Sequence, residues 1–570
     1  MLAPFHYFGI ADLEIDDQSV EDPRLFSRLA SPERAEHVMK KIEEYSVSRE
    51  DRRGLVFCNR NDEAAELSRL FNEQGYRTLS LSGSDSDEVR DKAIADLESG
   101  RVEYLFTVNI FNEGIDIPSL NQIIMLRRTE SPIVFVQQLG RGLRKANGKE
   151  YALVLDFIGN YQQNYLVPMA LSGDRTYSKD NLRAFVKEGS TILPGCSTIS
   201  FDEISEKRIF KAVDAGRFSD AALIKGEYSH LKNMLGRIPS LSDFDKNESI
   251  DPLIIFGKYG SYPGFLMRYE SDFEGRFTAE QLDMLKFISQ KMGNGKRSED
   301  LQLLRKLIES RTVELDDLLL SARGDESDPE SVRFMREETM RSVAAFLSGK
   351  FSSSSSHPLI GLSGGLCSLG SRFAHALVDP VFRAQVLDVI DFGLARHEKL
   401  YKEKYRETSL TLYAKYTYEE VCKLLNWEKN INGQNIGGYK YDAKTNTFPV
   451  FINYDKDPDI DAAIRYEDRF VSDRELVAIS KQPRTMASPE IQRLEGCPEN
   501  GMRVYLFMRK DKNDGDGGKE FYFLGEMYPT GFFNPIVMPG TTKTAVEIGY
   551  RLDRPVRGDI YDYLTSTFKE

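Results

Sequence analysis

Paired cysteines are missing from the sequence. Its five cysteines are odd in number, and no two of them stand at the Cys-x-x-Cys spacing of a metal site. This pattern argues against both a disulfide framework and a zinc site. We therefore expect reduced, mostly buried thiols, no intrinsic metal ion and a cytoplasmic location.

Long apolar runs are missing too. The first residues lack a basic stretch followed by an apolar one, and no later segment is long and apolar enough to cross a bilayer. The sequence thus predicts neither a signal peptide nor a membrane span. The net charge of -13 does not exclude a nucleic-acid partner, because positive charge can gather in one groove. It does argue against a protein that coats nucleic acid by charge alone.

A phosphate-binding loop is the third absence. The pattern Gly-x-x-x-x-Gly-Lys-Ser/Thr does not occur in the 570 residues. The nearest string is Gly-Asn-Gly-Lys-Arg at 293–297, which follows a predicted helix rather than a strand. Arg297 stands where Ser or Thr is needed. We predict a helix C-cap and a solvated loop there.

Short apolar runs and amphipathic runs alternate between residues 54 and 159. Continuous apolar strands separated by helices predict a parallel sheet that is covered on both faces, which is an α/β fold. The predicted strands are 54–58, 77–81, 104–108, 122–126 and 151–158, and the predicted helices are 62–71, 87–97 and 132–144.

The pattern of apolar and polar residues changes twice after this region. The chain is also too long to fold around one hydrophobic core. We predict an α/β domain over 1–165, a helical domain over 166–407 and a small α+β domain over 408–570. The serine run at 352–356 is predicted to be a loop. The Gly-rich stretch 511–518 is predicted to join two strands of a hairpin.

The strongest chemical signal is Gln-Gln-Leu-Gly-Arg-Gly-Leu-Arg at 137–144. Arg141 and Arg144 are three residues apart, so one helix face would direct both the same way. A guanidinium can bind phosphate oxygens and stabilise charge on a phosphoryl group in transfer. Gly140 and Gly142 would let another surface approach closely. The alternative is a solvated basic helix end.

A second signal lies upstream, at 107–118. This segment follows a predicted buried strand, at the carboxyl edge of a parallel sheet, where ligands bind. Gly114 permits a tight turn there, and Asp116 could accept a hydrogen bond from a ribose hydroxyl or pair with an arginine. The alternative is a plain loop.

The two signals in series resemble motifs V and VI of superfamily 2 helicases. Leu-Val-Phe-Cys-Asn at 55–59 resembles motif IV, a strand of the second RecA-like domain, and Ser82-Gly83 resembles a turn that contacts the nucleic-acid backbone. The resemblance implies that Arg141 and Arg144 are catalytic. It also implies nucleotide contacts by Gly114, Asp116, Gln137 and Gly140, and nucleic-acid contacts by Ser82, Gly83 and Thr107.

The resemblance continues along most of the chain. The chain resembles a bacterial group of DEAD/DEAH-type helicases with a C-terminal domain of unknown function. The resemblance is found in the segments 4–9 and 155–160 and in the stretch from 425 to 526. Some members carry a phospholipase-D-type nuclease, and some belong to restriction or phage-defence loci. In this group a first RecA-like domain holds the phosphate loop and an acidic Mg²⁺ motif, and neither occurs here.

The resemblance therefore implies that ATP and Mg²⁺ bind only together with a first motor domain, supplied in cis or in trans. The chain would be a fragment, a split-gene product or a truncated paralogue. The implied partners are DNA or RNA, that motor domain and a nuclease, with no membrane.

The region after 408 holds an aromatic and basic group. Trp427, Lys429, Tyr439, Lys440 and Tyr441 could stack on bases and contact phosphates. The alternative is core packing with solvated lysines. The alternating aspartates at 455–461 lack the EF-hand pattern, so a solvated acidic loop is predicted there.

The sequence thus predicts the second motor half of an ATP-dependent DNA helicase or translocase. Two alternatives stay open. One is a nucleic-acid or partner-binding module with a degenerate motor, and the other is a nuclease in the C-terminal domain, although no cluster of carboxylates with a nearby lysine is evident.

Overall fold

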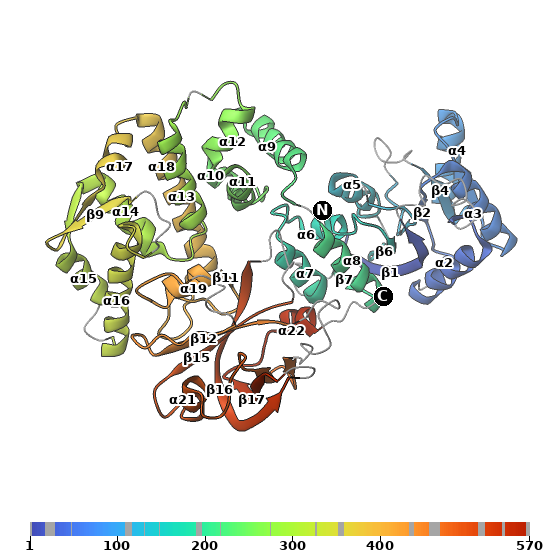
Figure 1. Ribbon diagram of the computed structural model, residues 1–570. Coiled ribbons are helices and arrows are strands. Elements are labelled where there is room, and N and C mark those ends of the chain that lie inside the picture. Colours follow the sequence, from blue (N-terminus) through green and yellow to red (C-terminus); the bar gives the residue numbers. More distant parts are fainter. Residues whose placement is uncertain are drawn as a thin grey trace. The chain divides into compact units, whose positions relative to one another are not determined.

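The computed structural model shows two compact units, which comprise residues 1–217 and residues 218–567 (Figure 1). The structure describes residues 3–16, 29–46, 48–108, 117–129, 131–146, 149–189, 197–216, 218–273, 275–324, 328–351, 358–431, 438–454, 468–510, 519–538 and 542–565.

A seven-stranded parallel sheet forms the centre of the first unit, with the strand order β3-β4-β2-β5-β6-β1-β7. The strands are β1 (Phe5–Asp16), β2 (Gly54–Phe57), β3 (Thr78–Leu81), β4 (Tyr104–Thr107), β5 (Gln122–Met125), β6 (Ala152–Asn160) and β7 (Thr198–Phe201). The helices are α2 (Pro32–Tyr45), α3 (Asn61–Glu73), α4 (Asp87–Glu98), α5 (Pro132–Gly142), α6 (Leu166–Ser172), α7 (Lys179–Glu188) and α8 (Glu203–Ala215).

Successive residues of the central strands enter two different cores, because side chains alternate between the faces of a sheet. In β2, Leu55 and Phe57 pack on one face with α4, α5, α6 and α7. Val56 and Cys58 pack on the other face with α2 and α3. Both faces are therefore covered, and the predicted RecA-like α/β fold is confirmed.

Two strands extend the sheet beyond the five that the sequence predicts. β1 pairs in parallel with both β6 and β7, so two of the segments that resemble the helicase group lie side by side. The Tyr7 hydroxyl of β1 donates to Asp156 of β6 at 2.6 Å. Burial raises the pKa of Asp156 to about 7. Because β7 and α8 belong to this unit, the unit continues past residue 165, where the sequence predicts a boundary.

The second unit begins with a helical region that also holds a small antiparallel sheet of order β8-β10-β9, which the sequence does not predict. Its strands are β8 (Thr312–Glu314), β9 (Ile360–Ser363) and β10 (Leu366–Leu369). Its helices are α9 (Ala221–Leu235), α10 (Leu241–Lys246), α11 (Pro252–Tyr259), α12 (Tyr262–Tyr269), α13 (Ala279–Lys291), α14 (Ser298–Ser310), α15 (Leu315–Arg323), α16 (Glu330–Leu347), α17 (Ser371–Ala376) and α18 (Pro380–Leu400).

A mixed sheet follows, with the order β12-β15-β16-β17-β14-β13 and with β11 paired to β16. β12 and β15 are parallel, and β15 and β16 are antiparallel, as the predicted hairpin requires. Residues 511–518 between them, like 352–356 and 455–461, lie outside the described residues. The strands are β11 (Lys415–Thr417), β12 (Thr447–Asn453), β13 (Arg469–Phe470), β14 (Glu475–Ile479), β15 (Arg503–Arg509), β16 (Glu520–Val537) and β17 (Thr544–Leu552), and the helices are α19 (Tyr418–Leu424), α21 (Pro489–Glu495) and α22 (Gly558–Thr565).

The loop at 293–297 is buried, which corrects the predicted solvated loop. Lys296 is 4% exposed and Arg297 is 1% exposed. The Lys296 ammonium donates to Glu420 of α19 and to Glu520 of β16, each at 2.8 Å. Arg297 pairs with Asp300 at 2.6 Å. Ionic contacts therefore join the helical region to the mixed sheet inside the second unit.

Within the described part of the chain, no helix combines the length and the apolar character that a bilayer crossing requires.

Candidate nucleotide and nucleic-acid edge of the first unit

The carboxyl ends of four neighbouring strands lie along one edge of the parallel sheet and place the Ser82-Gly83 turn and Thr107 there. Thr107, the last residue of β4, is in register with Leu81 of β3 and with Phe57 of β2. Phe57 is in turn in register with Met125 of β5. Residues 58–59, 82–83 and 126–128 therefore follow their strands at the same edge, where parallel sheets bind ligands.

The turn at Ser82 and Gly83 is open. The Asp85 carboxylate accepts the Ser82 backbone N–H at 2.6 Å and fixes the turn. A Cβ atom on Gly83 would meet nothing within 4 Å, and the Gly83 carbonyl accepts from Arg90 at 2.7 Å. An exposed backbone held by local hydrogen bonds suits a contact with a phosphate chain.

Thr107 is fully buried, and no described residue is within hydrogen-bond reach of its hydroxyl. Its carbonyl accepts the Cys58 N–H at 2.9 Å. The Thr107 side chain is therefore not available at the surface of this structure, and the predicted contact of Thr107 with a nucleic-acid strand stays a prediction. A buried hydroxyl without a partner is uncommon. Gly114 and Asp116 lie outside the described residues, so their roles stay predictions.

Helix α5 ends at Gly142, two residues before Arg144. Arg141 and Arg144 therefore do not share a helix face, and that part of the prediction is wrong. A Cβ on Gly142 would stand 2.7 Å from the Ile123 side chain of β5, so a glycine at this position lets α5 pack closely against the sheet. Gly142 thus serves packing against the unit's own sheet rather than approach by another surface.

The exposed side of α5 carries the other predicted residues. Gln137 is exposed, and a Cβ on Gly140 would meet nothing within 4 Å. Arg144 is also exposed, while the Arg141 side chain lies outside the described part of the structure. The surface around Gly140 leaves room for a ligand or a second protein surface.

Lys149 holds the end of α5 in place, which the sequence does not reveal. Its ammonium donates to the carbonyls of Gly142 at 2.6 Å and Arg144 at 2.8 Å. It also donates to the carbonyl of Pro118, the last residue of the 107–118 segment, and to the carbonyl of Leu120. Burial lowers the pKa of Lys149 to about 8. One side chain thus ties the two predicted motifs together.

We expect Lys149→Met to destabilise the first unit by about 1.5–3 kcal/mol, because hydrogen bonds to a charged group are lost. Amides after α5 should exchange faster with solvent, and hydrogen exchange with mass spectrometry measures this. Lys145→Met, which removes an exposed lysine of the same segment, is the matched control. Equal protection in both variants would contradict the anchoring role.

A buried ion network supports the same edge from the other face of the sheet. Arg34 of α2 is fully buried and pairs with Asp12 of β1 and Glu63 of α3, each at 2.6 Å. Arg34 also donates to the carbonyl of Leu126 at 3.0 Å, as does the Asn59 side chain. The signal in the sequence is a lone arginine four residues before Val38, on the stripe that α2 buries.

In the second unit, Trp427 is only 2% exposed, and its indole N–H donates to Thr447 at 2.9 Å. A ring that is packed and hydrogen-bonded in this way is not available to stack on a base. The predicted base-stacking role of Trp427 is therefore corrected, and core packing is the better interpretation. Lys429 is exposed, so its predicted phosphate contact stays a prediction.

Comparison with known families places the first unit among helicase motor domains. Residues 35–146 match the helicase conserved C-terminal domain, so the chain contains this domain. Residues 410–564 match DUF3427, a domain of unknown function, and residues 224–402 match DUF8090, another domain of unknown function. The predicted resemblance to helicases with such a C-terminal domain is confirmed.

Two of the curated relatives are ATP-dependent helicases by name. The putative ATP-dependent helicase IRC3 of Saccharomyces cerevisiae is 32% identical over 105 residues, which is 18% of this chain and 15% of that protein. The ATP-dependent RNA helicase SrmB of Haemophilus influenzae is 30% identical over 109 residues, 19% of this chain and 25% of that protein. The chain therefore matches a quarter or less of these relatives' lengths.

Among solved structures, a fragment of a putative HsdR subunit of a type I restriction enzyme from Vibrio vulnificus is similar, with 19% identity and a TM-score of 0.25. That match covers 29% of this chain and 33% of the other chain. The DEAD-box protein SrmB of E. coli, bound to a regulator of ribonuclease activity, has 21% identity and a TM-score of 0.20, over 30% of this chain and 84% of the other.

Proposed function

We propose that the first unit is the second motor half of an ATP-dependent helicase or translocase that acts on nucleic acid. The observation that carries the proposal is that residues 58–59, 82–83 and 107 lie at the ends of neighbouring strands, along one carboxyl edge of a parallel sheet whose sequence matches the helicase conserved C-terminal domain. Service in restriction or phage defence stays a prediction from the sequence.

In this proposal the exposed residues on α5 contact one side of a bound nucleotide, and a second domain contacts the other side. Gln137 and Gly140 are three residues apart and leave an uncovered surface, and Arg144 lies exposed just beyond them. In this proposal Arg141 and Arg144 neutralise charge that develops on the phosphoryl group of ATP. The phosphate loop and the Mg²⁺ ligands come from a separate RecA-like domain. ATP, when bound between the two domains, supplies the energy for movement.

The nucleic acid would contact the carboxyl edge of the sheet in this proposal. The Ser82-Gly83 backbone would touch phosphates, and such contacts hold a strand without reading its sequence. Closure and opening of the cleft between the two motor domains in each ATP cycle would then move the strand. The Lys149 and Arg34 contacts keep α5 and the strand ends at fixed positions during these movements.

We expect the chain by itself neither to bind ATP tightly nor to hydrolyse it, because it has no phosphate-binding loop. Phosphate release in the presence of single-stranded nucleic acid, before and after addition of a first motor domain, is the measurement. Activity that appears only on addition supports a motor half. If no activity appears although the two proteins bind each other, a binding module with a degenerate motor becomes the better account. Turnover by the chain alone that survives Arg141→Ala would overturn the proposal.

A further inference from the structure

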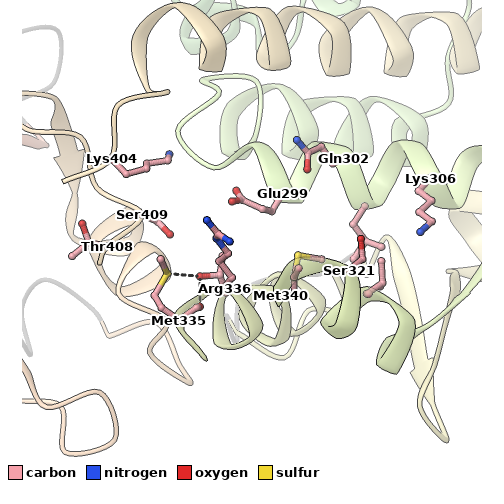
Figure 2. Close-up of a pocket in the computed structure, with 14 residues that line it drawn as sticks. Glu299, Gln302, Lys306, Ser321, Met335, Arg336, Met340, Lys404, Thr408 and Ser409 are labelled. Carbon is pink, nitrogen blue, oxygen red and sulfur yellow. Dashed lines mark hydrogen bonds between the residues drawn. The ribbon is translucent and has the colours of Figure 1, made fainter. Parts of the chain in front are cut away.

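A pocket of about 380 Å³ opens in the helical region of the second unit, between α14, α15, α16 and the segment after α18 (Figure 2). This volume lies in the range of small-molecule sites, which is about 300–1,000 Å³. Its walls are mixed, with apolar side chains on one part and charged, amide and hydroxyl side chains on the rest. Leu303, Leu318, Ala322, Met335 and Met340 supply the apolar surface.

Lys404 is the unusual residue of this pocket. Its amine is buried, yet no described residue accepts a hydrogen bond from it. A buried charge without a partner is costly, so such groups in native proteins call for an explanation. Burial lowers the pKa of Lys404, against the through-space effect of Glu299. Because a lysine side chain has four rotatable bonds, the amine can turn into the pocket without a change of backbone.

The charged groups around Lys404 favour an anion. Figure 2 shows the ends of Lys404, Glu299 and Arg336 directed toward the same part of the pocket. Arg336 donates to Asp328 at 2.6 Å, and a guanidinium has further N–H donors to offer. Lys306 lines the pocket as well. The lining holds three basic side chains and one carboxylate, and Asp328 balances the Arg336 charge in part, so the excess positive charge comes from the two lysines.

We propose that this pocket binds a small organic anion, a phosphate monoester or a carboxylate on an apolar body. The anionic group contacts the Lys404 ammonium and Arg336, and the body packs against the leucine and methionine side chains. The anion supplies the acceptor that Lys404 lacks. The pocket lies entirely in the second unit, so this proposal does not depend on the proposed motor function.

The test uses the full chain and calorimetric titration with AMP, phenyl phosphate and benzoate. Adenosine and phenol are the matched compounds without the anionic group, and inorganic phosphate is the anion without an apolar body. We expect at least one of the three organic anions to bind, and its uncharged counterpart to bind at least about tenfold more weakly, because a charged hydrogen bond is lost.

Four variants assign the site. Lys404→Met and Ala322→Phe, which fills the pocket without touching the amine, should each weaken binding by about tenfold or more. Lys402→Met removes a nearby lysine that is 66% exposed, and it should leave binding unchanged. Lys404→Arg keeps the charge and should retain binding.

Proton uptake separates a direct role of Lys404 from a structural one. At alkaline pH a phosphate monoester is already a dianion, so proton uptake on binding reports the amine. Titration in two buffers of different ionisation enthalpy measures that uptake, and Lys404→Arg should abolish it. The proposal is overturned if none of the three anions binds the folded chain at millimolar concentration, if binding survives in both Lys404→Met and Ala322→Phe, or if binding takes up no proton.

Discussion

In an enzyme reconstituted with a first motor domain, Arg141→Ala and Arg144→Ala should each lower ATP turnover by about 10³- to 10⁵-fold, the usual contribution of an arginine finger. The reason is that a guanidinium stabilises charge on the phosphoryl group mainly in the transition state. ATP binding should therefore weaken far less than turnover. Steady-state phosphate release and nucleotide titration measure the two effects separately.

Lys145→Ala is the control for this prediction, because it removes one positive charge from an exposed position beside Arg144. It should change turnover by no more than about threefold, which screened surface charge can explain. If the two arginine variants behaved like Lys145→Ala, neither arginine would be a finger. Since Arg144 lies beyond the end of α5, the two arginines would have to reach a nucleotide from different backbone positions.

Lys296→Met should lower the free energy of unfolding of the second unit by about 3–5 kcal/mol, because it leaves buried charge without a partner. Glu420 would lose its ion pair at 2.8 Å, and Glu520 would lose its own at the same distance. Burial disfavours the Lys296 ammonium, but the two carboxylates outweigh this effect and raise its pKa. Urea unfolding followed by circular dichroism measures the loss.

Lys291→Met is the matched control, because it removes the partner of Glu419 on the surface of the same helical region. An exposed pair of this kind contributes at most about 1 kcal/mol. The double variant Lys296→Met with Glu420→Gln should recover part of the stability, since the uncompensated carboxylate is gone. Equal losses for Lys291→Met and Lys296→Met would show that the buried contacts do not stabilise the unit.

The sequence predicts the centre of the first unit well, because the strands β2, β4 and β5 are buried on both faces and read as unbroken apolar runs. It does not predict β1 and β7. β1 mixes His6, Gly9 and Asp12 with apolar residues, and β7 has only four residues. Such segments become strands through their neighbours in the sheet rather than through their own pattern.

The errors at the sites have a common physical cause, which is that burial depends on residues far away in the sequence. The loop at 293–297 looks solvated until Glu420 and Glu520 are brought to Lys296. The positions of Trp427 and its neighbouring lysines in the sequence are typical of a base-stacking surface. In the structure, however, the Trp427 ring is buried in the core and donates a hydrogen bond to Thr447. The role of Gly142 likewise depends on its close contact with Ile123 of β5, which the local sequence does not reveal.

The Lys296 contacts also bear on where the protein can be divided. A cut near residue 407 would separate Lys296 from Glu420 and Glu520, which follow it by 124 and 224 residues. Each piece would then hold a charged side chain that has lost its ion-pair partner. Each piece would also expose surface that is buried in the intact unit. Truncations at that point should give pieces that aggregate or unfold. A cut at Phe218, where the second compact unit begins, leaves all three residues together and is the division that keeps this unit intact.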